Sequence, residues 1–126
     1  MSLILDSGGL IAFDRGDRDV AALVEATRRR RERAVTSSGC VAQAWRGGGP
    51  RQALLARLLR GLHEHGLDPD VSRSVGRLCD EATTTDVVDA HVALMAHDGD
   101  VVITSDAKDL RKLLRATGSS AELRPC

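Results

Sequence analysis

Aromatic side chains are nearly absent from this chain. Its 126 residues include no tyrosine and only two aromatic residues, Phe13 and Trp45. Modules that read single-stranded RNA usually stack several bases on several aromatic faces. A base-stacking platform of that kind is therefore hardly available to this sequence.

Cysteines and long apolar runs are also scarce. Cys40, Cys79 and Cys126 are odd in number and widely spaced, and no C-x-x-C pair occurs. This pattern disfavours a disulfide framework and a zinc ribbon, and it favours a reducing, intracellular setting. No segment reaches the roughly 18 apolar residues of a membrane span, and Asp6 interrupts the N-terminal apolar run before it could serve as a signal peptide. We therefore expect a cytoplasmic protein.

The chain has no excess of either charge. Its 18 basic and 18 acidic residues give a formal net charge of zero, so binding of nucleic acid by bulk electrostatics is not expected. Any polyanionic partner must use a local patch. The length is typical of one domain, and no linker or internal repeat interrupts it. We expect a single domain over residues 1–126.

Apolar runs typical of buried strands alternate with helical stripes along the chain. Strands are expected at residues 2–6, 34–36, 66–71, 100–104 and 121–124. Helices are expected at residues 10–13 after a tight turn, 20–31, 38–45, 50–62, 72–82, 86–97 and 108–116. Strands separated by helices, with no hairpin signal, predict a parallel sheet covered on both faces. The expected fold class is α/β, a three-layer α/β/α sandwich with four to five strands.

Three aspartates occupy positions typical of a metal site. Asp6 and Asp106 each follow an apolar run at the end of an expected strand, and Asp89 interrupts the apolar face of an expected helix. Ligands of open parallel sheets bind at the carboxyl ends of the strands, where distant residues can converge. Oxygen-only ligands suit Mg²⁺ or Mn²⁺ bridging to phosphate. The alternative is that Asp106 caps a helix and Asp89 is merely exposed.

Three segments resemble those of PIN-domain ribonucleases, particularly the VapC toxins of bacterial toxin–antitoxin pairs. They are residues 3–12 (LILDSGGLIA), 86–96 (DVVDAHVALMA) and 102–110 (VITSDAKDL), in the family's order and spacing. The resemblance covers essentially the whole chain. It implies a metal-dependent endoribonuclease that hydrolyses RNA, with a cognate antitoxin as partner and a homodimeric assembly.

The resemblance also assigns roles to individual residues. Asp6, Asp89 and Asp106 would be the catalytic acids that bind Mg²⁺ or Mn²⁺. Asp109 would be an outer or fourth acid, and Ser7 and Thr104 would be supporting hydroxyls.

Gln43 departs from the family's pattern, since a glutamate normally stands there on the helix after the second strand. An amide oxygen can ligate a hard ion but brings no charge, so cation affinity should fall. The alternative to an active nuclease is thus an impaired PIN-like domain that binds RNA or a protein without cleavage. Arg46 and Arg51 flank the glycine run 47–49 and would lie near the substrate groove.

Other motifs are weaker. The glycine run lacks the Lys-Ser/Thr of a phosphate loop, and a receiver-like domain would need paired acids where Asp6 stands alone. His63 and His65, if helical, would point to different sides and form no metal site. The arginine run 28–33 fits a solvated helix C-terminus better than an RNA site, although both remain open.

Overall fold

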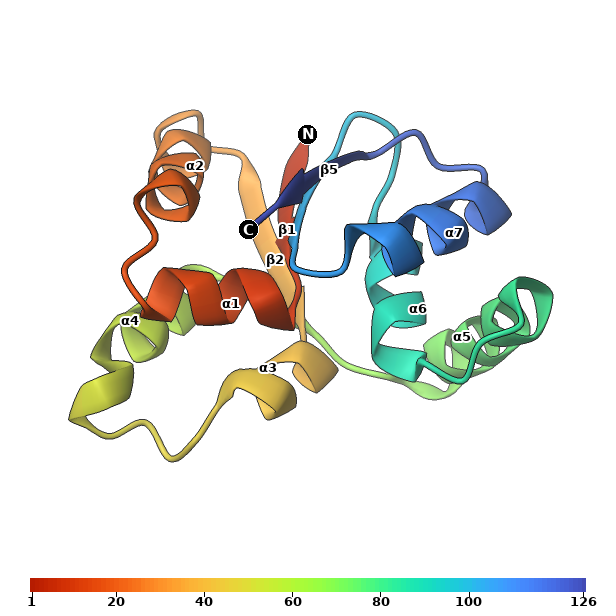
Figure 1. Ribbon diagram of the computed structural model, residues 1–126, viewed down its shortest axis with the longest axis horizontal. Helices are drawn as coiled ribbons and strands as arrows, with labels where there is room; N and C mark the ends of the chain where they lie inside the picture. Colours follow the sequence, from red (N-terminus) through yellow and green to blue (C-terminus); the bar gives the residue numbers. More distant parts are fainter.

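The computed structural model describes residues 1–126 and contains one five-stranded sheet between two groups of helices (Figure 1). The strands are β1 (Ser2–Leu5), β2 (Arg33–Ser37), β3 (His63–His65), β4 (Val101–Thr104) and β5 (Glu122–Pro125). Every neighbouring pair is parallel, and the strand order is β3-β2-β1-β4-β5. The predicted three-layer α/β/α sandwich with a parallel sheet is confirmed.

Helices form both outer layers. One layer contains α1 (Ser7–Asp14), α2 (Arg18–Arg29), α3 (Ser38–Ala44) and α4 (Ala53–Gly61), with a short 3₁₀ turn at Pro50–Gln52 before α4. The other contains α5 (Pro69–Ala82), α6 (Val87–Met95) and α7 (Ala107–Thr117). Figure 1 shows the first group to the left of the sheet and the second to its right. None of these helices is long and apolar enough to span a membrane.

The strand order reverses direction at the centre of the sheet. From β1 the chain adds β2 and β3 on one side, then returns to add β4 and β5 on the other. In open parallel sheets, ligands bind in the crevice outside the carboxyl ends of the two strands where the order reverses. The topology therefore points to the ends of β1 and β4, which are followed by Asp6 and by Ser105-Asp106.

The core explains why the central strands read as apolar runs. Leu3, Ile4 and Leu5 of β1 are buried, as are all four residues of β4. A strand covered by helices on both faces has no solvent side, so its pattern is continuous rather than alternating. The polar strands β3 and β5 lie at the two edges, where residues are mostly exposed.

The expected strand at 66–71 is wrong. Strand β3 lies earlier, at His63–His65, and Pro69 begins α5 instead of interrupting an edge strand. Asp68 caps this helix, because its carboxylate accepts a hydrogen bond from the backbone N–H of Val71 at 2.8 Å. Proline suits the first turn of a helix, where its missing N–H is not needed. Ser72 is therefore inside α5 and is not its cap.

Two further expectations need correction. Ser7, Gly8 and Gly9 do not form a turn but are the first residues of α1. His63 and His65 lie on a strand, where alternate residues share a face, so the helical argument against a metal site does not apply. Both histidines are exposed at the sheet edge.

Leu10 offers a test of this packing. Its side chain is 0% exposed at the centre of the core, so Leu10→Ala should lower the free energy of unfolding by about 2–5 kcal/mol. Leu54 on α4 is 39% exposed, and Leu54→Ala should cost roughly 1 kcal/mol or less. Urea denaturation measures both. Equal losses for the two variants would contradict the position of Leu10.

Candidate metal centre

Asp6 is held at the end of β1 by its neighbours on both sides. Its N–H donates to the carbonyl of Ile103 in β4 at 3.2 Å, and its carboxylate accepts from the N–H of Gly9 at 2.9 Å, which caps α1. The hydroxyl of Thr104, which is fully buried, lies beside the same carboxylate. Asp6 itself is only 3% exposed. Its position is therefore set by the sheet and by the helix that follows.

Gly8 and Gly9 bring α1 close to β4. A Cβ at Gly8 would lie 2.8 Å from the backbone nitrogen of Ser105 and would overlap the Ser105 side chain. A Cβ at Gly9 would lie 3.0 Å from the carbonyl oxygen of Ile103. Neither glycine has a positive φ, so what each supplies is the absence of a side chain. This close approach places the start of α1 against the loop that carries Asp106.

Carboxylates from α6 and α7 converge at this end of the sheet. One oxygen each of Asp89, Asp106 and Asp109 lies within 4.8 Å of the others. Asp106 stands at the N-cap position of α7, yet its carboxylate makes no capping hydrogen bond. Its backbone N–H donates to the Thr104 hydroxyl at 2.8 Å, so one threonine contacts both Asp6 and Asp106. The capping alternative does not describe Asp106.

Asp89 has an unpartnered oxygen. Its Oδ2 is buried and makes no hydrogen bond. The cap of α6 is Asp86, whose Oδ1 accepts from the N–H of Asp89 at 2.9 Å. Asp89 therefore lies in the first turn of α6 and is half-buried, so the alternative that it is merely exposed is wrong. A buried carboxylate oxygen without a partner is costly unless a proton or a cation meets it.

The sequence interpretation overlooked two residues at this site. Asp86 and Lys112 line a cavity of about 100 Å³ together with Asp89 and Asp109. Asp86 lies three residues before Asp89 at the start of a helix, and residues three apart lie on the same side of a helix. This spacing could have indicated Asp86 from the sequence. Lys112 has the same spacing from Asp109 and is one of only two lysines in the chain.

Burial shifts two of these acids, Asp6 and Asp89, toward the protonated form. Burial raises the pKa of Asp89 to about 7, and the charges of Asp86, Asp106 and Asp6 add to the effect. Burial also raises the pKa of Asp6, although hydrogen bonds from Thr104 and from the backbone of Gly9 and Gly8 oppose the shift. The folded protein without a cation therefore disfavours the charged forms of Asp6 and Asp89.

These residues fit a hard divalent cation. The donors are carboxylate oxygens and a hydroxyl, with no sulfur or imidazole among them, and one buried oxygen lacks a partner. Oxygen donors of this kind suit Mg²⁺ or Mn²⁺. The helices α1 and α7 also begin here, and their N-terminal dipoles favour negative charge. The arrangement can therefore bind a cation that bridges to an anionic ligand.

Ser7 and Gln43, the two other expected residues, differ in position. Ser7 is the half-buried first residue of α1, directly after Asp6. Gln43 is exposed on α3, one helical turn after Cys40. The buried thiol of Cys40 has a pKa raised by burial and by the charge of Asp6, which shows that the first turn of α3 faces this site. Gln43 lies one turn further away.

Arg46 and Arg51 flank the loop between α3 and α4. The Arg46 guanidinium donates to the carbonyl oxygens of Trp45 at 2.7 Å and Ala42 at 3.3 Å, which covers the C-terminus of α3. Arg51 lies exposed in the 3₁₀ turn before α4. Neither arginine is paired with an acidic residue in an ion pair.

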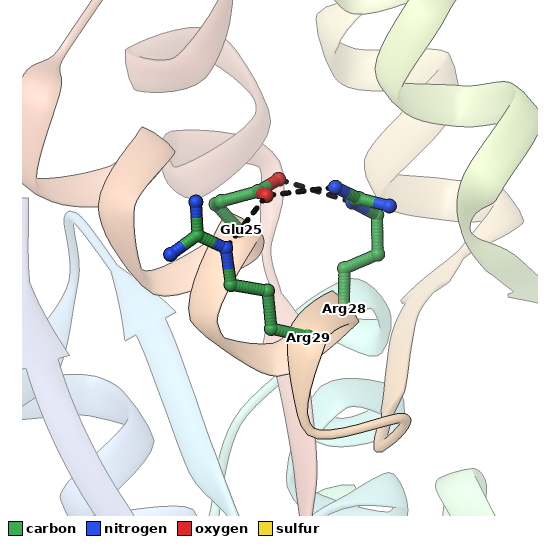
Figure 2. A network of polar contacts seen from close by, with 3 residues as sticks. All are labelled: Glu25, Arg28 and Arg29. Atoms are coloured by element: carbon green, nitrogen blue, oxygen red, sulfur yellow. Dashed lines mark hydrogen bonds and ion pairs between the residues drawn. The ribbon is translucent and has the colours of Figure 1, made fainter.

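The arginine run 28–33 lies at the opposite end of the sheet, where β2 begins. Figure 2 shows that Glu25 contacts both Arg28 and Arg29, at 2.7 and 3.1 Å. Cations in the last turn of α2 also complement its dipole. The geometry favours the helix-end interpretation of this run.

Asp89 makes stability depend on pH in the absence of metal. The fold raises the pKa of Asp89 from its ordinary value of 3.8 to about 7, so unfolding releases a proton at pH values between these two. The free energy of unfolding of metal-free protein should therefore fall as pH rises from about 4 to about 7, then level off. Asp89→Asn should remove much of that fall, whereas Asp70→Asn on the exposed start of α5 should not. Urea denaturation in the presence of chelator, from about pH 4 to about pH 7, measures the free energy of unfolding. Identical pH profiles for Asp89→Asn and wild type would contradict the raised pKa of Asp89.

The chain was compared with proteins of known sequence and structure. No protein-family model and no curated protein sequence matches it. Among solved structures, a chain of VapBC2 from Rickettsia felis, bound to a DNA fragment from its promoter, superposes with a TM-score of 0.70 at 12% identity, covering 100% of this chain and 99% of that one. PAE2754 from Pyrobaculum aerophilum superposes with a TM-score of 0.58 at 20% identity, covering 94% and 97%. The chain therefore has the fold of a VapC-like PIN domain.

Proposed function

We propose that the protein is a metal-dependent endoribonuclease that acts as the toxin of a toxin–antitoxin pair. The observation that carries the proposal is the convergence of acids at the point where the strand order reverses, with a buried oxygen of Asp89 left unpartnered. The structural likeness to a VapBC2 chain supports the same conclusion. Hydrolysis of RNA is the reaction class that fits such a site.

Asp6, Asp89 and Asp106 would hold Mg²⁺ or Mn²⁺, and Asp109 would hold a water of the ion or complete the set. A bound ion of this kind polarises a water for attack on a phosphodiester and stabilises the leaving oxygen. The protein's own part is to fix the carboxylates: the Thr104 hydroxyl contacts Asp6 and accepts from the N–H of Asp106. Ser7 would add a hydroxyl at the start of α1.

Asp89 links metal binding to protons. A carboxyl with a pKa of about 7 is partly protonated at neutral pH and must lose its proton to ligate a cation. Metal affinity should therefore rise with pH through this region. The exposed Lys112 on the rim of the neighbouring cavity offers a positive charge to a substrate phosphate.

We propose two protein partners, a cognate antitoxin that covers the site and a second copy of this chain. The likeness to a VapBC2 chain supports the antitoxin, and the homodimer is what the sequence resemblance implies. Arg46 and Arg51 carry no acidic partner and would contact RNA or an acidic segment of the antitoxin.

A second candidate is an impaired domain that binds RNA or protein without cutting. Gln43 favours it, because this exposed amide stands where the family has a glutamate. The loss of one carboxylate lowers cation affinity without altering the fold. The nuclease and the impaired domain would share the fold and would differ in whether bound RNA is cleaved.

Cleavage should need both the ion and Asp6. Purified protein should cut single-stranded RNA with Mg²⁺ or Mn²⁺ and not with chelator, and Asp6→Asn should lower the rate by at least about 100-fold because the buried carboxylate is lost. Gel analysis of labelled RNA measures the rate. Asp70→Asn is the matched control, since Asp70 is exposed on α5 and should leave the rate unchanged. Metal-independent cutting, or full activity of Asp6→Asn, would overturn the mechanism.

Gln43→Glu tests the departure from the family. If Gln43 faces the ion, the new carboxylate should raise Mn²⁺ affinity, on the order of tenfold, and increase the cleavage rate. Titration calorimetry with Mn²⁺ measures affinity independently of activity. The control is Ala42→Glu, which adds the same charge at the preceding, exposed position of α3. Unaltered affinity and rate for Gln43→Glu would show that this position does not serve the metal.

A further inference from the structure

Trp45 is the only tryptophan in the chain, and the fold leaves it 38% exposed. It directly follows α3, and its six-membered ring lies against the backbone of Gly48. A Cβ at Gly48 would overlap that ring, and the φ of Gly48 is +65°, a conformation that favours glycine. The loop is therefore shaped around an indole that stays open to solvent on its other side.

The side chain of Gln52 stabilises the loop between α3 and α4 through three hydrogen bonds. Its Oε1 accepts from the N–H groups of Arg46 at 2.7 Å and Gly48 at 3.1 Å, and its Nε2 donates to the carbonyl of Ala44 at 2.9 Å. One side chain thus ties together residues on both sides of Trp45. A held aromatic side chain loses little conformational entropy when it binds a ligand.

The segment around Trp45 is basic although the whole chain is neutral. Residues 33–63 contain no aspartate or glutamate. The same segment contains five arginines: Arg33, Arg46, Arg51, Arg57 and Arg60. Arg46 directly follows Trp45, and Arg51 lies in the 3₁₀ turn at the end of the same loop. An exposed aromatic ring beside unpaired cations is complementary to a nucleic acid strand, whose bases stack and whose phosphates are anionic.

The loop is connected to the acidic cluster by α3. The first turn of this helix faces Asp6 through Cys40, and Trp45 follows seven residues after Ser38, about 10 Å along the helix axis. Trp45 is thus too far away to touch a reacting phosphate at the cluster. It is near enough to contact a neighbouring nucleotide of the same strand.

We propose that Trp45 stacks against one unpaired base of a single-stranded RNA, while Arg46 and Arg51 contact the adjacent phosphates. This proposal rests on the proposed function and names the form of RNA that the site takes. The scarcity of aromatic residues excludes a platform that stacks several bases. A single indole fixed in its loop can still stack against one base. Trp45 is then a positioning residue, outside the group that holds the metal.

The chain's own fluorescence tests the proposal. With chelator present to prevent cleavage, wild-type protein is titrated with a short single-stranded oligoadenylate while indole emission is recorded. Stacking on the only tryptophan should quench the emission in a saturable way, and the same sequence annealed into a duplex should not. RNA that binds, by anisotropy of a labelled strand, without changing the emission would overturn the proposal, as would failure to bind at all.

Variants separate stacking from structure. Trp45→Ala should weaken binding of the oligoadenylate on the order of 10–100-fold, while Trp45→Phe keeps an aromatic face and should recover much of that loss. Arg51→Ala should weaken binding and reduce its salt dependence, whereas Arg77→Ala on α5 is the matched control and should not. Circular dichroism checks that each variant is folded. Equal affinities for Trp45→Ala and wild type would overturn the proposal.

Kinetics distinguish this proposal from the proposed function. With Mg²⁺, Trp45→Ala should raise KM for single-stranded RNA and leave kcat nearly unchanged, unlike Asp6→Asn, which should abolish kcat. Quenching by RNA without any cleavage would overturn the nuclease and leave the stacking site standing. Cleavage with unaffected emission and unaffected KM would overturn the stacking site and leave the nuclease standing.

Discussion

The cost of holding carboxylates away from water is the constraint on which the candidate site depends. Asp6 is buried, Asp89 and Asp106 are half-buried, and burial is the main cause that raises the pKa of both Asp6 and Asp89. A fold that gathers such groups must offset their cost with the core around them. The buried apolar residues of β1 and β4, directly behind the acids, supply that stability and fix the distance between the two strand ends.

Most of the site's precision comes from backbone geometry. Parallel pairing of β1 with β4 sets Asp6 opposite Thr104, and the missing side chains of Gly8 and Gly9 let α1 approach the loop that carries Asp106. Helix N-termini then face the acids and favour their charged form. The helix N-termini and hydrogen bonds only reduce the electrostatic cost of the gathered carboxylates, whereas a bound cation would offset it. The unpartnered oxygen of Asp89 is informative for this reason, because it is a free ligand atom for such a cation.

The sequence predicts the parts of this fold that local patterns determine. The apolar runs of β1 and β4 and the stripes of most helices are local, and so are the acids that follow them. The strand β3, His63–His65, has no apolar pattern and forms through pairing with β2, a long-range contact that no local window contains. Pro69 does not distinguish an edge strand from the first turn of a helix, because proline suits both positions. Asp86 was overlooked because its capping role resembles that of any helix start.

Gln43 affects the cost of gathering negative charge at this end of the sheet. A glutamate at this exposed position would add a negative charge to α3, the helix whose first turn faces the cluster, where Asp89 is already partly protonated at neutral pH. An amide lowers the electrostatic cost of the metal-free state, and for the same reason it lowers the gain when a cation binds. The net charge of zero conceals an uneven distribution, since every aspartate and glutamate lies outside residues 33–63, where the charged residues are all arginines. In the proposed mechanism, a site that binds its ion less tightly would depend more on the basic loop around Trp45 to hold the RNA.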